Sequence, residues 1–524
     1  MNGARALIRT LVDHGVDTCF MNPGTSEMHF VAALDDVPEL RGVLALFEGV
    51  ATGAADGFAR ITGRAAAVLL HLGPGLGNGL ANLHNARRAH SPVLAIVGDH
   101  ATTHRRYDAP LQSDIVSAAC NVSPWVWTAE STGGLTADAV EALVNAYGPP
   151  GAVATLVLPA DVSWDEGGVP APVDPDGLGA RPRAGLAPDP GVLGGAAAAL
   201  TSGEPAAVLI GGRVCVGPLL EQAADLAATT GARFLAETFP ARLERGAGRP
   251  PVDRLAYLAE FAALQLEGVR HLILLDAPSP VSFFAYPGKA SDLVPEGCTV
   301  HTVVAPHDDA AAAVADLAER VGSRPGAAPR QEPGRPDLPT GPLTAQSVCQ
   351  ALGALLPEDA IVSDEGATST LFAPGATAGA PAHDWLTLTG GAIGQGLPVA
   401  LGAAVGAPGR RVVALEADGS ALYTFQALWT MAREGLDVTT VIFDNRSYAV
   451  LNMELDRVGA GGAGTRAREM LDLSRPDLDF VALATGMGVP ATRATTSEEF
   501  TEALARSLAT PGPSLIDAVV PPLL

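Results

Sequence analysis

One predicted βαβ unit near the carboxyl terminus constrains the fold of this chain most strongly. The apolar run Val412–Leu415 ends at a turn that contains Asp418, and the apolar run Val438–Phe443 ends at a turn that contains Asn445. Between the runs, the sequence predicts a helix over Ala421–Arg433. Buried strands joined by a helix pair in parallel, so both strands end at the same edge of the sheet. The two polar turns are therefore expected to lie side by side.

The side chains of these turns predict a metal and a diphosphate. A ligand of a doubly wound sheet binds beyond the carboxyl ends of its strands. Asp418 offers a carboxylate there, Asn445 offers an amide oxygen, and Ser447 follows in the second turn. Mg²⁺ prefers such hard oxygen ligands and completes its shell with water and phosphate oxygens. Either turn alone is ordinary turn sequence, but together they favour a diphosphate clamped through Mg²⁺.

These turns resemble the cofactor motif of the thiamin diphosphate (ThDP) enzymes, in which a GDG turn is followed, after the next strand, by NN. Ala417 stands where the family has the first Gly, and Asp444 replaces the first Asn. The resemblance covers nearly the whole chain and is strongest to benzoylformate decarboxylase and the acetolactate synthase group. It assigns the cofactor to Asp418, Gly419, Ser420 and Asn445, and the metal to Asp418, Asn445 and Ser447.

The chain is long enough for three domains. It has 524 residues, of which 48% are apolar and 17% charged, as expected of a folded globular protein. Alternating helical patterns and buried runs predict an α/β fold of three doubly wound parallel-sheet domains over 1–165, 190–322 and 342–524, separated by Pro- and Gly-rich linkers. The resemblance implies that these are the pyrimidine-binding, middle and diphosphate-binding domains.

Charge and cysteine content limit the partners. The formal net charge of −24 disfavours nucleic acid and anionic membranes, because phosphate binding needs clustered Lys and Arg. No apolar run is long enough to span a membrane, and the first residues predict an amphipathic helix rather than a signal sequence. The five scattered cysteines suggest neither disulfides nor a zinc site, which favours the cytoplasm. The resemblance implies a small-molecule 2-oxo acid as substrate and a homodimer or homotetramer with shared active sites.

Two catalytic candidates lie in the first domain. Glu48 begins a predicted helix of small residues, where a carboxylate is often only a partner of the helix dipole. The resemblance matches it to the glutamate that promotes the imino tautomer of the cofactor. His71 ends a buried strand and is followed by a predicted glycine turn. Asn78 interrupts the GxGxxG pattern of that turn, so a dinucleotide site is disfavoured. A buried core role is open for His71, but it matches a family histidine that assists protonation.

Further residues of the first domain match the family's substrate pocket. Asn22 and Thr25 lie in the turn after the first strand, which as plain sequence is also a common helix cap. Pro110 and Leu111 lie in a polar loop together with His100 and His104. The spacing of the two histidines suits a pair of metal ligands on a helix, but no third ligand accompanies them. Solvated loop histidines are the preferred interpretation.

The glycine-rich stretch of the third domain matches the family's pyrimidine cradle. Ala367 and Thr368 follow a predicted strand and are expected at the diphosphate. The stretch TLTGGAIGQGLP contains one bulky residue, Ile393, among glycines that permit close approach. The resemblance implies that Ile393 forces the bent shape of the cofactor and that the Gly391 carbonyl receives its amino group.

Val450, Leu451 and Glu454 follow the metal turn on a predicted helix and are expected to face the substrate. Acetolactate synthases have a tryptophan where this chain has Glu454, and the chain lacks the GMHG stretch that accompanies FAD in that group. At Phe283, benzoylformate decarboxylase has its second catalytic histidine. FAD is allowed by the strand ends Ile210–Arg213 and Asp276–Pro278 of the middle domain, but no complete fingerprint supports it.

These observations predict a ThDP- and Mg²⁺-dependent enzyme that acts on a 2-oxo acid by C2-carbanion attack and decarboxylation. His71 favours a decarboxylase like benzoylformate decarboxylase. The lack of a histidine at Phe283 leaves open an acetolactate synthase-like carboligase. A non-catalytic regulatory subunit of the same fold is a further alternative, against which the retained Glu48 argues.

Overall fold

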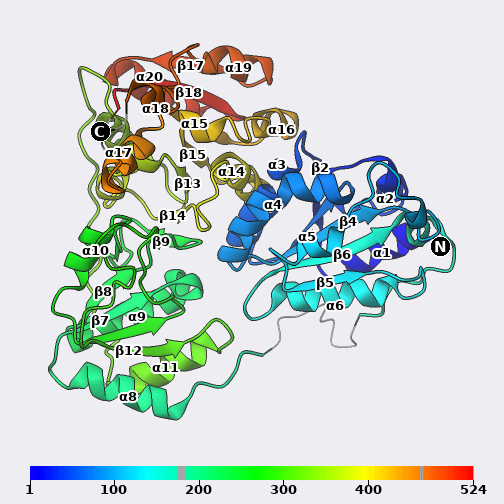
Figure 1. The fold of residues 1–524 in the computed structure, drawn as a ribbon. Helices are drawn as coiled ribbons and strands as arrows, with labels where there is room; N and C mark the ends of the chain where they lie inside the picture. Colours follow the sequence, from blue (N-terminus) through cyan, green and yellow to red (C-terminus); the bar gives the residue numbers. More distant parts are fainter. Residues whose placement is uncertain (174–183, 461, 463, 523–524) are drawn as a thin grey trace.

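The computed structural model describes residues 1–173, 184–460, 462 and 464–522. Three sheets, each with its own set of helices, form three α/β domains (Figure 1). The predicted fold class is therefore confirmed. No helix in the described part of the chain is both long and apolar enough to cross a membrane.

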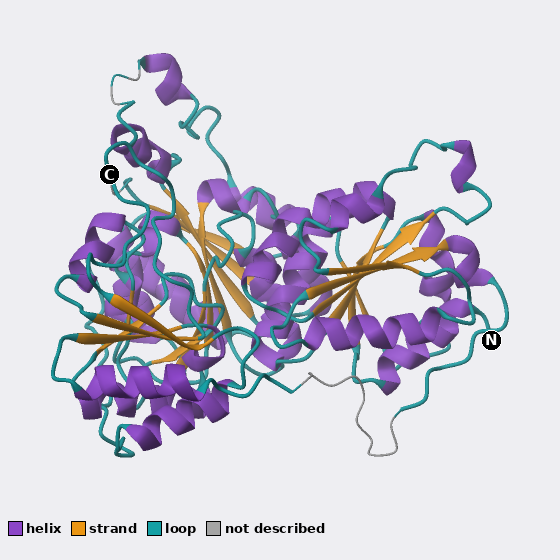
Figure 2. Ribbon diagram, turned by 60° about the horizontal axis from the view of Figure 1, so that its bottom comes forward, coloured by secondary structure: helices purple, strands orange, loops and turns teal. Residues whose placement is uncertain are grey.

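The first domain is a six-stranded parallel sheet in the order β2-β1-β3-β4-β6-β5. Helices cover both faces of this sheet (Figure 2), because its central strands are buried apolar runs. Its strands are β1 Thr18–Asn22, β2 Arg41–Leu44, β3 Ala66–Leu70, β4 Val93–Asp99, β5 Trp125–Thr128 and β6 Val153–Pro159. Its helices are α1 Gly3–Asp13, α2 Met28–Ala33, α3 Glu48–Thr62, α4 Leu72–Arg88, α5 Ile115–Ala119, α6 Leu135–Tyr147 and α7 Ala160–Trp164, with the 3₁₀ turns η1 Thr25–Glu27 and η2 Arg105–Tyr107.

The second domain is a five-stranded parallel sheet in the order β10-β8-β7-β11-β12. Its strands are β7 Ala206–Ile210, β8 Arg233–Ala236, β10 Asp253–Arg254, β11 His271–Leu275 and β12 Thr299–Val304. Its helices are α8 Pro190–Thr201, α9 Gly217–Thr230, α10 Ala259–Leu266 and α11 Ala310–Arg320, with η3 Gly212–Cys215. The short strand β9, Leu243–Arg245, leaves this domain and pairs antiparallel with β14 of the third sheet.

The third domain has a seven-stranded sheet in the order β17-β18-β16-β15-β13-β14-β9, parallel except for β9. Its other strands are β13 Ile361–Glu365, β14 His383–Leu386, β15 Val412–Ala417, β16 Val438–Asp444, β17 Ala491–Ala494 and β18 Ser514–Val519. Its helices are α12 Ala345–Leu355, α13 Ala373–Ala376, α14 Gly396–Gly406, α15 Asp418–Ala421, α16 Ala427–Glu434, α17 Ala449–Arg457, α18 Thr465–Glu469, α19 Phe480–Gly486 and α20 Ser497–Ala509, with η4 Ala367–Thr370.

The first and third domains pack through small residues on α3 and α14, which lie side by side in Figure 1. A Cβ on Gly402 would collide with the carbonyl oxygen of Ala54, and one on Gly57 would collide with that of Val399. Glycine at these two positions therefore permits the close approach of the two helices. This packing brings the start of α3, with Glu48, to the same side as the start of α14.

Two local predictions are wrong. The helix expected over Ala421–Arg433 is instead two elements, α15 and α16, separated by turns over residues 422–426, and within this break Thr424 Oγ1 donates to the Gly394 carbonyl at 2.9 Å. The glycine turn expected after His71 is instead helical, since α4 starts at Leu72. Gly79 permits close helix packing, because a Cβ there would lie 2.8 Å from Cγ2 of Thr52 on α3.

Candidate active site

The two polar turns meet at the ends of the adjacent strands β15 and β16. Asp418 begins α15, and its Oδ2 accepts hydrogen bonds from the backbone N–H groups of Asn445 at 3.1 Å and Arg446 at 2.5 Å. Its Oδ1 accepts from Gly419 N–H at 2.8 Å. Asp418 and Asn445 are both buried, at 1% and 8% exposed. The structure thus brings the two expected metal ligands into direct contact.

The chemistry of this turn fits a divalent cation. Burial raises the pKa of the Asp418 carboxyl, against the opposing effect of its backbone donors, so a cation beside it would be favoured. The Asn445 Oδ1 accepts the Ser447 N–H at 3.0 Å, and a carbonyl oxygen has a second lone pair. Among the residues that the structure describes, no three His, Cys, Asp or Glu side chains form a metal cage. A magnesium ion here would therefore need oxygens from a diphosphate or water.

The remaining diphosphate candidates lie at neighbouring strand ends. Ser420 Oγ donates to the Ala417 carbonyl at 3.1 Å, within the turn of Asp418. Ala367 and Thr368 lie in η4, which follows β13, the strand next to β15. A Cβ on Gly419 would collide with the ring of Tyr448, so the chain passes closely there. These positions surround one edge of the sheet, as a bound diphosphate requires.

A buried carboxylate, Glu365, accepts backbone hydrogen bonds from the glycine loop of residues 387–396. Glu365 accepts hydrogen bonds from the N–H groups of Gly394 at 2.6 Å and Gly396 at 2.5 Å. Gly391 has a φ of +73°, which favours glycine, and Ile393 is partly exposed beside it. Both residues thus lie on a loop whose backbone is fixed beyond Ile393.

A second buried carboxyl group lies beside Glu365, and the sequence predicted a role for neither. The register of β13 and β15 places Glu365 opposite Glu416. Burial raises the pKa of both carboxyl groups, that of Glu365 to about 7, and the nearby Glu365 adds to the effect on the pKa of Glu416. The signal in the sequence is a glutamate at the end of each of two apolar strands.

Glu48 lies at the first position of α3 and is 7% exposed. The side-chain amide of Asn78, on α4, donates to its Oε2 at 3.0 Å. From the same face of α4, Asn82 Nδ2 donates to the Gly49 carbonyl at 2.8 Å and to the Gly394 carbonyl at 3.1 Å. The residue after Glu48 is thus joined through one amide to the glycine loop.

His71 forms a dyad with a buried glutamate, Glu27, for which the sequence predicted no role. His71 Nδ1 lies 2.8 Å from Oε2 of Glu27, which also accepts the Gly24 N–H at 2.8 Å. Glu27 is 1% exposed, and its Oε1 has no hydrogen-bond partner among the residues that the structure describes. Thr25 shares η1 with Glu27, and Asn22 ends the preceding strand. Glu27 is the last residue of the turn NPGTSE and is therefore visible in the sequence. Only the fold shows that it contacts His71.

The loop that follows β4 lies against the start of α4. A Cβ on Gly73 would collide with the Ser113 hydroxyl, two residues beyond Leu111. Pro110 and Leu111 are both exposed in this loop. The rings of His100 and His104 are 5.3 Å apart, and neither belongs to a metal-binding cluster of the described residues. The loop therefore lies close to the start of α4, which follows His71. Its two histidines form no metal site with other described residues.

Helix α17 carries the three expected substrate residues and contacts the middle domain. Val450 is partly buried and Leu451 exposed. The Tyr257 hydroxyl donates to Oε1 of Glu454 at 3.4 Å, and Oε2 of Glu454 lies 3.5 Å from Nε of Arg457. The charge of Glu454 is therefore offset by a guanidinium on the next turn of the same helix.

Phe283 of the middle domain lies against the glycine loop. A Cβ on Gly391 would lie 2.6 Å from Cζ of Phe283. The Phe283 ring packs edge-on to Phe239, with centroids 5.8 Å apart, and tilted to Tyr257 at 5.3 Å. Three aromatic side chains of the middle domain thus pack together beside the glycine loop.

The strand ends of the middle domain are occupied by its own side chains. Arg213 pairs with Asp276 through Nε and Nη2, at 2.8 and 2.9 Å, and Gly212 N–H donates to Glu237 at 3.0 Å. The Arg213 guanidinium at these strand ends is thus already paired with Asp276, and Glu237 adds a carboxyl group rather than a cation for a pyrophosphate. FAD binding therefore gains no support here.

Two family descriptions match the chain. "Thiamine pyrophosphate enzyme, N-terminal TPP binding domain" matches residues 1–119, which contain Glu48 and His71. "Thiamine pyrophosphate enzyme, C-terminal TPP binding domain" matches residues 367–518, which contain Asp418 and Asn445. Both halves of the site thus fall within matched segments.

Similar proteins match over the full length. A Mycobacterium tuberculosis (strain H37Rv) protein, provisionally named acetolactate synthase large subunit IlvX, is 60% identical over 526 residues, covering 100% of both chains. Benzoylformate decarboxylase from Pseudomonas aeruginosa is 34% identical over 535 residues, covering 96% of each. Among solved structures, 4-hydroxybenzoylformate decarboxylase from Rhodococcus jostii RHA1 has a TM-score of 0.84 at 24% identity, covering 99% of each, which is a likeness of fold.

Proposed function

Because the chain belongs to the thiamin diphosphate enzyme family, in its decarboxylase and acetolactate synthase group, we propose that it binds ThDP through Mg²⁺ and decarboxylates a 2-oxo acid as benzoylformate decarboxylase does. The observation that carries this proposal is the contact between Asp418 and the turn of Asn445 at two adjacent strand ends. It supplies two hard oxygen ligands where a diphosphate would arrive.

In this proposal, Asp418, Asn445 and Ser447 hold the metal. Gly419, Ser420, Ala367 and Thr368 surround the diphosphate, while Gly391 and Ile393 hold the pyrimidine ring. When bound, ThDP supplies the carbanion that attacks the 2-oxo carbon. The residues of the chain bind the cofactor, exclude water and transfer protons.

Glu48 is proposed to exchange a proton with the pyrimidine ring. Its carboxylate is shielded from solvent and oriented by the Asn78 amide, both of which support a positioned acid–base group. The buried dyad of Glu27 and His71 is proposed to move a second proton. If His71 Nδ1–H donates to Glu27, its Nε2 is left as the free acceptor.

An acetolactate synthase-like carboligase is the second candidate. Phe283 favours it, because an aromatic ring against Gly391 supplies no proton where the resembled decarboxylase has a histidine. The name of the 60% identical relative points the same way. The chain's five unpaired cysteines support a cytoplasmic setting.

The test is a screen of aromatic and aliphatic 2-oxo acids with ThDP and Mg²⁺, in which carbon dioxide, aldehyde and 2-hydroxyketone are measured together. A decarboxylase releases aldehyde in step with carbon dioxide, whereas a carboligase yields the hydroxyketone. Asp418→Ala is the negative control. Carbon dioxide release that is equal in this variant and the wild type would rule out the proposed site.

We also propose a homodimer or homotetramer with shared active sites, as the family resemblance implies. Light scattering at assay concentration tests this, because an active monomer would contradict a shared site.

A further inference from the structure

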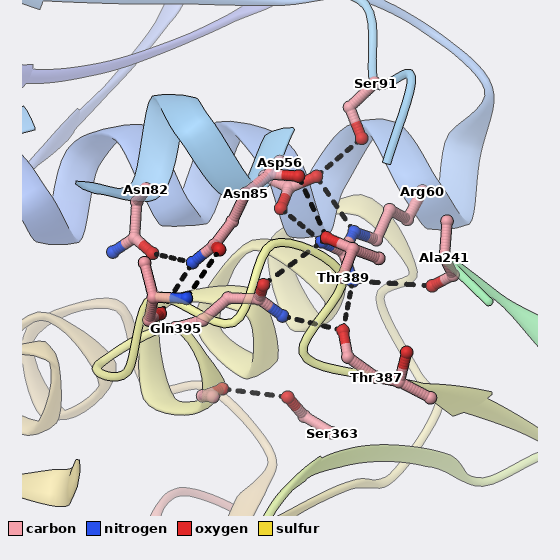
Figure 3. Close-up of polar contacts among 12 residues, drawn as sticks. Asp56, Arg60, Asn82, Asn85, Ser91, Ala241, Ser363, Thr387, Thr389 and Gln395 are labelled. Carbon is pink, nitrogen blue, oxygen red and sulfur yellow. Dashed lines mark hydrogen bonds and ion pairs between the residues drawn. The ribbon is translucent and has the colours of Figure 1, made fainter. Parts of the chain in front are cut away.

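The proposed chemistry makes no use of a buried ion pair on α3. Arg60 Nε donates to Oδ1 of Asp56 at 2.8 Å, and its Nη2 donates to Oδ2 at 2.6 Å (Figure 3). The side chains are 1% and 0% exposed. The Ser91 hydroxyl donates to Asp56 at 2.5 Å, so the carboxylate is well satisfied. A buried pair of this kind is a poor source of stability compared with apolar side chains, so its other contacts bear on what it does.

Arg60 reaches from the first domain to both ends of the glycine loop. Its Nη1 donates to the Thr387 carbonyl at 2.8 Å, where the loop begins. Its Nη2 donates to the Thr389 hydroxyl at 2.9 Å and to Gln395 Oε1 at 3.3 Å, where the loop ends. Gln395 Nε2 donates in turn to the Thr387 carbonyl at 2.9 Å, which closes the loop at its base (Figure 3).

Helix α4 forms hydrogen bonds with the middle of the same loop. Asn85 Nδ2 donates to the Ala392 carbonyl at 2.8 Å, and Asn85 Oδ1 accepts the Ala392 N–H at 3.2 Å. The Thr389 hydroxyl donates to the Asn85 carbonyl at 2.9 Å. His84 Nε2 lies 3.1 Å from the Gly390 carbonyl. A Cβ on Gly390 would collide with Asn85 Oδ1, so the helix and loop are in close contact.

These contacts fix the residues on either side of Gly391. A glycine-rich loop has large conformational freedom, and ordering it costs free energy unless the surroundings impose one shape. The contacts from α3 and α4 are made to peptide groups and to polar side chains rather than to apolar surface. They therefore specify the path of the backbone more than they stabilise the fold.

We propose that Arg60 and Asn85 are positioning residues for the pyrimidine half of ThDP. They act through the loop, by holding the Gly391 carbonyl and Ile393 in the shape that receives the ring. The inference rests on the proposed function, in which this loop holds the pyrimidine and the turn of Asp418 holds the diphosphate. It predicts that the two halves of the cofactor respond differently when the loop contacts are weakened.

The test titrates the protein by calorimetry with Mg–ThDP and, separately, with Mg–pyrophosphate. Thr389→Val removes the hydroxyl that joins Arg60 to Asn85 while keeping the side-chain shape, and Asn85→Leu removes both contacts to Ala392. We expect each variant to bind ThDP about tenfold more weakly, as the loss of one or two hydrogen bonds predicts, with pyrophosphate affinity unchanged. Arg64→Gln is the matched control, because Arg64 follows the same helix but forms a surface ion pair with Asp17.

A second readout is hydrogen–deuterium exchange at C2 of ThDP, measured with the cofactor saturating. We expect slower exchange in both variants than in the control. A misplaced pyrimidine ring would lie in the wrong position for proton exchange with Glu48. Equal losses of ThDP and pyrophosphate affinity, or no loss of either, would overturn the positioning role. A wild-type protein that binds neither ligand would instead overturn the proposed function, and the inference with it. Arg60→Lys is a supporting variant, in which loss of folding is detected by a thermal scan.

Discussion

Replacing Glu48 by glutamine separates cofactor binding from proton transfer. The change keeps the shape of the side chain and leaves an oxygen to accept the Asn78 amide, which lies 3.0 Å from Oε2. Glu48 is the first residue of α3, where a negative charge gains about 0.3–1 kcal/mol from the helix dipole. The variant should therefore fold and lose at most about 1 kcal/mol of stability by this route.

The expected loss in chemistry is larger. A positioned acid–base group contributes about 10²–10⁴ in rate, which corresponds to about 2.7–5.4 kcal/mol of barrier. The low exposure of Glu48, 7%, leaves little room for water to replace it. We therefore expect slowed exchange at C2 of bound ThDP and decarboxylation reduced at least as far, with ThDP affinity close to that of the wild type.

The assay quenches the holoenzyme in acid after timed exposure to D₂O and follows the C2 proton by NMR, while calorimetry gives the ThDP affinity. Glu39→Gln is the control, because this glutamate pairs with Arg9 on the surface. Exchange at the wild-type rate with ThDP bound would refute the role of Glu48. Exchange and affinity that fall together would indicate a structural role instead.

Three further predictions concern other parts of the molecule. Asp418→Ala should abolish ThDP binding in magnesium-containing buffer, because a metal ligand is lost; unchanged affinity by calorimetry contradicts the metal assignment. Glu454→Gln should raise the share of acetolactate formed from pyruvate, because it removes one of the two carboxylates beside Arg457, which lie at 3.5 Å (Glu454) and 3.1 Å (Glu260), and so lowers the negative charge near the substrate; an unchanged product ratio refutes a substrate contact. Burial raises the pKa of Glu237 from 4.5 to about 7, so the native state binds this proton more tightly than the unfolded chain and stability falls as the pH rises through that range. The melting temperature of Glu237→Gln should therefore exceed that of the wild type by more at pH 8 than at pH 5.5; an equal difference at both refutes the linkage.

The meeting of Asp418 with the Asn445 turn follows from sequence because parallel strands end at one edge of a sheet. That rule depends only on recognising two buried runs and a connecting helix. The details of the connection do not follow, since the break between α15 and α16 contains Thr424, which contacts Gly394 from a distant part of the chain. Local propensity carries no information about that contact.

Contacts between distant segments explain the other misses. The glycines after His71 indicate a turn by local preference, yet they allow α4 to pack against α3. Glu27 reaches His71 only through the pairing of β1 with β3. Arg60 reaches Thr387 across 327 residues of sequence. Residues of this kind are found by locating buried polar side chains in the fold rather than by spacing in the chain.

The central claim is that this chain binds ThDP through a magnesium ion held by Asp418 and Asn445. The most direct measurement is a calorimetric titration of the cofactor-free protein with ThDP, in excess MgCl₂ and again in EDTA. We predict one ThDP bound per chain in magnesium and loss of binding in EDTA, restored when Mg²⁺ is added back. Equal affinity in the two buffers, or no binding in magnesium, would contradict the account.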